Sequence, residues 1–329
     1  MTGPAEPIEF VGVDGNRLVG EMRGAGGPPV LLLHGGGQTR HSWEDTAIRL
    51  AAAGFRAITI DQRGHGDSDW VANGAYIFTD YAADVTAVAG EIAERFGERP
   101  VAIGASLGGI SALLAEGDAS SGLLRALVLV DITPRIDPGG VARILAFMGD
   151  KVEEGFASIE EAADAIASYL PHRKRPESLD GLRKNLRLDP DGRYRWHWDP
   201  AFLVGRQNVN SHVDHIEQRL VGASKALTIP VLLVRGARSE LVSEEHAREF
   251  LALVPHARLV DVSGAGHMVA GDRNDVFGAA IGDFLGGRHR PVRREGAVSG
   301  PGTPASASQG TPPGPRRSRR CRNRRRPAP

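Results

Sequence analysis

The stretch Val101–Gly109, "VAIGASLGG", places a serine between glycines at the end of an apolar run. The run before Ser106 is typical of a buried strand, and the following "LGGISALLAEG" is typical of a buried helix. Gly104, Ser106 and Gly108 therefore form a GxSxG pattern at a strand-to-helix junction. Small flanking residues allow a sharp, strained turn that lifts the serine hydroxyl above the sheet. The pattern predicts a nucleophile elbow.

Two other glycine-rich turns do not fit this stretch. A dinucleotide-binding loop would have glycine in place of Ser106. A phosphate-binding loop would have Gly-Lys-Ser or Gly-Lys-Thr near residue 109, where the sequence reads "GGIS". A catalytic serine therefore accounts for the turn best.

Short apolar runs alternate with helical patterns along the chain, which predicts the α/β class with a mostly parallel eight-stranded sheet flanked by helices. The predicted strands occupy residues 8–13, 17–23, 28–35, 55–61, 99–106, 124–131, 229–236 and 257–264. Between about 132 and 228 the strand pattern stops, and segments such as "SIEEAADAIASYL" have helical periodicity. We therefore expect core segments at 1–131 and 229–286, with a helical cap at 132–228.

The last segment, 287–329, differs in composition from the rest. It holds twelve of the chain's 40 basic residues and one of its 40 acidic residues, so the remainder is acidic. Its Pro, Gly, Ser and Arg content offers little to bury, which predicts a disordered tail. No aromatic residues separate the arginines, so we expect no specific nucleic-acid partner.

Composition also limits compartment and cofactors. No window approaches the roughly 18 apolar residues of a membrane span, and the N-terminus lacks a signal-peptide pattern, which favours a cytoplasmic protein without membrane attachment. The single cysteine, Cys321, excludes a disulfide framework or a thiolate metal site. The spacing in "HVDHIE" at 212–217 lacks a third ligand, so we expect neither metal nor cofactor.

A serine nucleophile needs a base, and His267 is the best placed of the eleven histidines. It follows the last predicted strand in a glycine-containing loop, "SGAGHM", at the sheet edge where Ser106 also emerges. His34 and His41 lie in loops after earlier strands and are candidates for the substrate pocket.

The motifs together resemble the α/β-hydrolase superfamily over residues 8–286. "HGGGQTRHSW" at 34–43 is similar to its oxyanion loop, and "DQRGHGDS" at 61–68 to a turn in its core. The resemblance extends to cofactor-free haloperoxidase-like hydrolases. Around "LVDITPRI" it extends to the vitamin B6 degradation hydrolases that act on an acetamidomethylene succinate. It implies a Ser, acid and His triad with Ser106 and His267 in family order.

The acid has two candidates. Members of the family commonly place it three residues past the glycine of "IPVLLVRG", where this chain has Ser239 followed by Glu240. A minority place it one strand earlier, at Asp131. A carboxylate that closes a buried run needs a partner, and an imidazole would provide one, so we favour Asp131 and keep Glu240 as the alternative.

Backbone amides are expected to form the oxyanion hole. Leu107 follows the nucleophile and would supply one N–H, and the resemblance implies Gly36 as the second donor, with Gly37 as the alternate. Trp43, Trp196 and Trp198 complete the tentative substrate pocket with His34 and His41.

The predicted function is a serine hydrolase that acts on a small-molecule ester, lactone, amide or related carbonyl compound through an acyl-enzyme on Ser106. A cofactor-free haloperoxidase or perhydrolase and a carbon–carbon bond hydrolase are the alternatives, because both use the same triad. A non-catalytic receptor on this fold is a further alternative. The sequence does not predict the oligomeric state.

Overall fold

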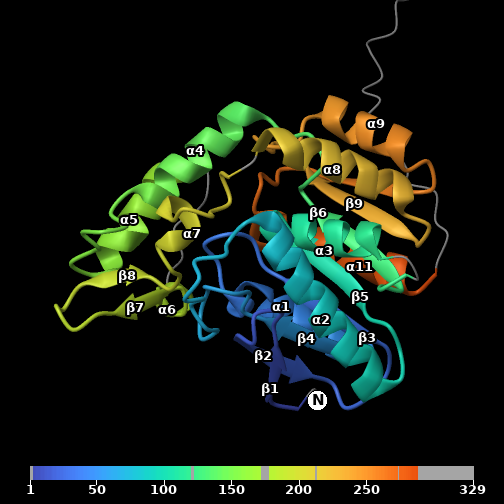
Figure 1. Ribbon diagram of the computed structural model, residues 1–329, viewed down its shortest axis with the longest axis horizontal. Helices are drawn as coiled ribbons and strands as arrows, with labels where there is room; N and C mark the ends of the chain where they lie inside the picture. The colour runs from blue at the N-terminus through green and yellow to red at the C-terminus, as the bar shows by residue number, and fades with distance from the viewer. Residues whose placement is uncertain (1–2, 120–121, 172–177, 212, 273, 288–329) are drawn as a thin grey trace, which may run out of the picture. The chain divides into compact units, whose positions relative to one another are not determined.

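Eight strands in the described part of the chain form one sheet, in the order β1-β2-β4-β3-β5-β6-β9-β10. The computed structural model describes residues 3–119, 122–171, 178–211, 213–272 and 274–287 (Figure 1). The predicted tail, 287–329, lies outside the described residues except for Gly287. The strands are β1 (Glu6–Val11), β2 (Arg17–Arg23), β3 (Pro29–Leu33), β4 (Arg56–Ile60), β5 (Val101–Ala105), β6 (Ala126–Val130), β9 (Val231–Gly236) and β10 (Arg258–Val262).

The strand directions bring the catalytic candidates to one edge. β1 and β2 are antiparallel to their neighbours, and all pairs from β4 to β10 are parallel. Parallel strands end at the same side of a sheet, so the loops after β3, β5, β6, β9 and β10 gather there. This arrangement confirms the predicted mostly parallel, eight-stranded α/β sheet.

Helices cover both faces because successive strand residues point to opposite sides. In β3, Leu31 and Leu33 pack in a core cluster with helices α2 and α3, whereas Val30 and Leu32 pack in a second cluster with α1 and α11. The two clusters explain the continuous apolar runs of the central strands. The core helices are η1 (Arg40–Trp43), α1 (Glu44–Ala52), α2 (Phe78–Phe96), α3 (Leu107–Asp118), α9 (Glu244–Leu253), α10 (Val269–Asp272) and α11 (Asn274–Leu285).

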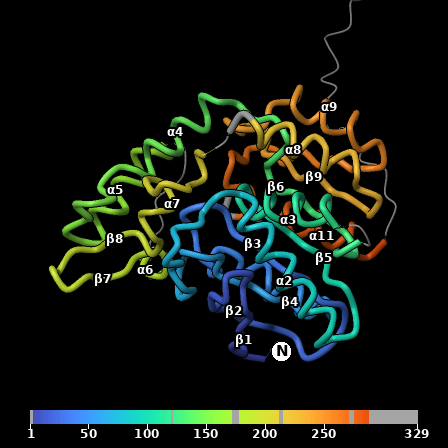
Figure 2. The backbone as a smooth tube through the Cα atoms, in the orientation of Figure 1, coloured from blue at the N-terminus to red at the C-terminus, as the bar shows by residue number. Residues whose placement is uncertain are grey.

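The segment between β6 and β9 is mostly helical, as Figure 2 shows in green and yellow. It also contains a two-stranded antiparallel sheet, β7 paired with β8, where no strand was expected. Each of these strands has only three residues, too few for a period-two pattern to be recognised. The segment comprises α4 (Pro138–Gly149), α5 (Ile159–Tyr169), α6 (Asp180–Arg183), β7 (Leu186–Leu188), β8 (Tyr194–Trp196), α7 (Ala201–Val204) and α8 (Val213–Ala226).

The last helix of this segment, α8, packs on the core helix α3. A Cβ atom on Gly117 would lie 2.4 Å from the Cβ of Ala223, so the two helices approach closely. Leu220 and Ala223 are buried in the same cluster as α2 and α3. We therefore propose that the cap consists of α4 to α7 with β7 and β8, and that α8 belongs to the core layer.

Candidate active site

Ser106 stands at a strained turn between β5 and α3. Its backbone angles are φ 46° and ψ −113°, and a non-glycine residue rarely adopts such a positive φ. A Cβ on Gly104 would lie 2.4 Å from the carbonyl oxygen of Gly108, and one on Gly108 would lie 2.4 Å from that of Leu33. Strand, turn and helix therefore meet backbone to backbone, which explains both glycines of the motif.

Asp131 follows β6 directly and is fully buried, also with a positive φ of 51°. Its Oδ1 accepts a hydrogen bond from the Gly236 amide at 2.9 Å. Its Oδ2 accepts from Ser239 Oγ at 2.5 Å and from His267 Nδ1 at 2.7 Å. A buried carboxylate is costly without donors, and this one has three.

His267 lies in the loop between β10 and α10 with 13% of its side chain exposed. An ionised carboxylate can only accept, so Nδ1 carries the proton toward Asp131 and Nε2 is the nitrogen able to take up another. The neighbouring Met268 sulfur accepts from Gln38 Nε2 at 3.2 Å, and Gln38 Oε1 accepts from the Gly35 amide at 3.0 Å. Gln38 therefore links the His267 loop to the loop after β3, through a contact between segments 230 residues apart.

Glu240, the alternative acid, is held by a different part of the molecule. Tyr169 on α5 donates its hydroxyl to Glu240 Oε1 at 3.4 Å. The Glu240 carbonyl oxygen lies against α4, because a Cβ on Gly140 would be 2.2 Å from it. Of the two carboxylates considered, Asp131 is the one that the structure brings to His267.

The loop after β3 approaches the elbow at Gly36. A Cβ on Gly36 would lie 4.0 Å from Leu107 Cβ and 3.0 Å from Phe202 Cζ. The amide of Gly37 is already engaged, since it donates to His65 Nε2 at 3.1 Å. Between the two glycines, Gly36 therefore fits the second oxyanion donor better.

His34 is fully buried, which corrects its assignment to the pocket. Its Nδ1 bonds the carbonyl of Gly35 at 2.8 Å, and its Nε2 accepts from the Gln62 amide at 3.0 Å. Burial lowers the pKa of His34 to about 4, and that of the adjacent buried His65 to about 3. Both rings are neutral, and their hydrogen bonds link the loop after β3 to the loop after β4.

Trp43 does not line a pocket either. It is 2% exposed and packs in the core cluster beneath α1 and α11, with its ring centroid 5.8 Å from that of Phe277. Because it directly precedes α1, its side chain follows the apolar face of that helix into the core. Its pocket assignment was wrong for this reason.

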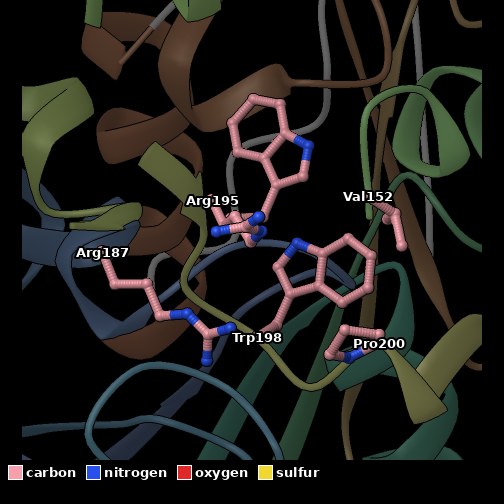
Figure 3. A pocket seen from close by; sticks show the side chains of 6 residues that line it. Val152, Arg187, Arg195, Trp198 and Pro200 are labelled. Atoms are coloured by element: carbon pink, nitrogen blue, oxygen red, sulfur yellow. The ribbon is translucent and has the colours of Figure 1, made fainter. Parts of the chain in front are cut away.

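Trp196 and Trp198 lie in the cap and differ in position. Trp196 packs between the rings of Phe147 and Phe156, with centroids 5.8 and 5.1 Å away. Trp198 reaches the loop after β3, with its Nε1 3.7 Å from the place of a Cβ on Gly37. Both line a small pocket in which Figure 3 shows the Trp198 indole between two arginines and two apolar side chains. Its lining is Val152, Arg187, Arg195, Trp196, Trp198 and Pro200.

His41 is partly buried on the wall of a second pocket of about 200 Å³. Burial, together with the positive charge of Arg40, lowers the pKa of His41. Neither Ser106 nor His267 is among the residues that line this pocket. The lining residues are Thr39, Arg40, His41, Gly66, Asp67, Arg183, Lys184, Leu186 and His197.

The described residues lack the side-chain group of a metal site and the long apolar helix of a membrane span. No group of three His, Cys, Asp or Glu side chains there could hold a metal ion. None of the helices found there is both long and apolar enough to cross a bilayer.

Residues 28–273 match the family model described as the alpha/beta hydrolase fold, so the chain belongs to this family and is an enzyme of the hydrolase class. It is 29% identical to an esterase of Mycobacterium tuberculosis, over 83% of this chain and 87% of the relative. It is 30% identical to a 2-(acetamidomethylene)succinate hydrolase of Mesorhizobium japonicum, over 83% and 94% of the two chains. A crystal structure of E-2-(acetamidomethylene)succinate hydrolase matches with a TM-score of 0.72 and 26% identity, over 86% of this chain and 100% of that one.

Proposed function

We propose that this enzyme is a serine hydrolase that cleaves a carboxylic ester, or a related lactone or amide, through an acyl-enzyme on Ser106. The observation that carries the proposal is the 2.7 Å bond between His267 Nδ1 and Asp131 Oδ2, at the sheet edge where the strained Ser106 emerges. This bond fixes the tautomer in which Nε2 can accept a proton.

The mechanism follows from these roles. His267 Nε2 takes the Ser106 proton as Oγ attacks the substrate carbonyl, and the developing oxyanion accepts hydrogen bonds from the Gly36 and Leu107 amides. His267 then returns the proton to the leaving group. A water molecule, deprotonated by the same imidazole, attacks the acyl-enzyme; the Oγ–acyl bond breaks, His267 returns the proton to Ser106 Oγ, and the acid is released.

The surroundings of the proposed oxyanion hole favour an uncharged acyl group. Apolar and aromatic groups from the cap lie against the glycines of the loop after β3: Phe202 against Gly36, and Met148 and Trp198 against Gly37. The two arginines near Trp198, Arg187 and Arg195, are already paired with Asp189, so a carboxylate placed here would lose hydration without gaining a free cationic partner. We therefore expect p-nitrophenyl butyrate to be cleaved faster than the p-nitrophenyl ester of succinate, which carries a free carboxylate.

Labelling with a fluorophosphonate probe tests the nucleophile. The wild-type chain should be labelled on the peptide that contains Ser106, and Ser106→Ala should abolish the label. Ser168→Ala, which removes an exposed hydroxyl on α5, is the matched control and should label normally. Labelling that persists in Ser106→Ala would refute the proposed nucleophile.

A further inference from the structure

The Ser239 hydroxyl occupies a defined place beside the triad candidates. It lies in the loop that follows β9, and its Oγ is 2.5 Å from Asp131 Oδ2. The same oxygen accepts hydrogen bonds from the amides of Leu241 and Val242, both at 3.0 Å. A hydroxyl has one proton and two lone pairs, and the two amides fill the lone pairs. The single proton therefore points to Asp131.

From this arrangement we infer that Ser239 is a positioning residue of the hydrolase, acting through Asp131; the inference rests on the proposed function. Two of the three donors to Asp131, the Ser239 hydroxyl and the Gly236 amide, play no direct part in proton transfer. They hold the carboxylate so that Oδ2 faces His267 Nδ1 throughout the reaction. The hydroxyl also offsets part of the cost of burying the Asp131 charge.

The loop around Ser239 is rigid enough for this role. Leu241 and Val242 are 2% and 0% exposed, so the amides that orient the hydroxyl are anchored by buried side chains. The Leu241 carbonyl accepts from the Asp137 amide at 2.9 Å, and Asp137 caps the N-terminus of α4. Side chains locked by packing and hydrogen bonds can hold a catalytic group to within about 0.5 Å.

Replacement of Ser239 with alanine removes the donor to a charged group. We expect Ser239→Ala to lower kcat for p-nitrophenyl butyrate by about 10- to 100-fold, as for the loss of one charge-assisted hydrogen bond. KM should change by less than about threefold, because Ser239 is proposed to act on the acid and not on the substrate. Ser239→Thr keeps the hydroxyl and should restore most of the lost rate.

Ser243→Ala is the matched control on the same loop. The Ser243 hydroxyl also accepts a hydrogen bond from a backbone amide, that of His246, at 3.1 Å. It caps the N-terminus of α9 and does not contact Asp131. Ser243→Ala should lower thermal stability by about as much as Ser239→Ala does, and it should leave kcat unchanged. Should Ser239→Ala fail to fold, Ser239→Cys serves instead, because a thiol has a similar size and is a weak donor.

A double-mutant cycle with Asp131→Asn separates positioning from a general structural effect. If Ser239 acts only through Asp131, adding Ser239→Ala to Asp131→Asn should cost less than about twofold more in kcat. Equal, additive losses in the two backgrounds, or a wild-type kcat in Ser239→Ala, would overturn the inference. Fluorophosphonate labelling of Ser106 in these variants reports on the proposed function separately, since that proposal fails only if labelling does not depend on Ser106.

Discussion

His267 Nδ1 and Asp131 Oδ2 are joined by a hydrogen bond of 2.7 Å across a sequence separation of 136 residues. The two residues belong to loops after β10 and β6, and β9 lies between these strands in the sheet. The imidazole therefore reaches over the end of β9 to the carboxylate. Ser239 and Gly236, which follow and end β9, supply the other donors to Asp131.

The choice of acid can be tested by separate replacement. Asp131→Asn should lower kcat/KM for p-nitrophenyl butyrate by about 10³- to 10⁴-fold, because an amide can stabilise the wrong imidazole tautomer. Glu240→Gln should stay within about threefold of wild type, since the Glu240 carboxylate accepts a hydrogen bond from Tyr169 on the cap. The reverse order of losses would assign the acid to Glu240.

Ser106 and His267 should act as one unit. Ser106→Ala and His267→Ala should each reduce turnover by about 10³-fold or more, and the double variant should be little worse than either. Steady-state kinetics with p-nitrophenyl butyrate would measure the three losses. Independent losses that multiply in the double variant would contradict a shared proton-transfer step.

The close backbone approach at the elbow predicts a stability effect. Gly108→Ala would place a Cβ 2.4 Å from the Leu33 carbonyl oxygen and should lower the free energy of unfolding by about 1–3 kcal/mol or more. Gly90→Ala, on α2 with no heavy atom within 4 Å of the new Cβ, should raise it by up to about 1 kcal/mol. Urea unfolding of both variants measures the difference, and a neutral Gly108→Ala would refute the tight packing.

Stability should fall as the pH drops below about 6.5. Burial lowers the pKa of His34 to about 4 and that of His65 to about 3, so the unfolded chain binds protons that the folded protein cannot. Between about pH 6 and 4, each histidine should contribute up to about 1.4 kcal/mol per pH unit to this loss. The free energy of unfolding, measured by urea titration across this range, gives the slope.

A variant pair separates this contribution from other titrating groups. His65→Asn removes one buried histidine and should make the slope shallower, whatever its effect on stability at pH 7. His256→Asn, which removes an exposed histidine, is the matched control. Equal slopes in the two variants would mean that His65 is protonated in the folded state.

The sequence determined the fold class and part of the site through local signals. The glycines around Ser106 were recognisable because a strained strand-to-helix turn requires small residues next to each other in the chain. The alternation of apolar runs with helical patterns predicted the parallel sheet, which the structure has. The position of His267 after the last predicted strand placed it at the same edge of the sheet as Ser106. These inferences needed only periodicity, chain order and the geometry of parallel strands.

The tertiary structure decided which distant groups meet. Asp131 and Glu240 both follow strands at the same edge, and only the directions of their side chains separate a contact with His267 from one with Tyr169. Trp43 and Trp198 are both tryptophans near turns, yet one packs under α1 and the other reaches the loop after β3. No sequence motif marks Ser239 as a positioning residue, because that proposed role depends on a hydrogen bond to Asp131, 108 positions away. Long-range packing fixes such contacts, because side-chain direction depends on neighbours that are remote in the sequence.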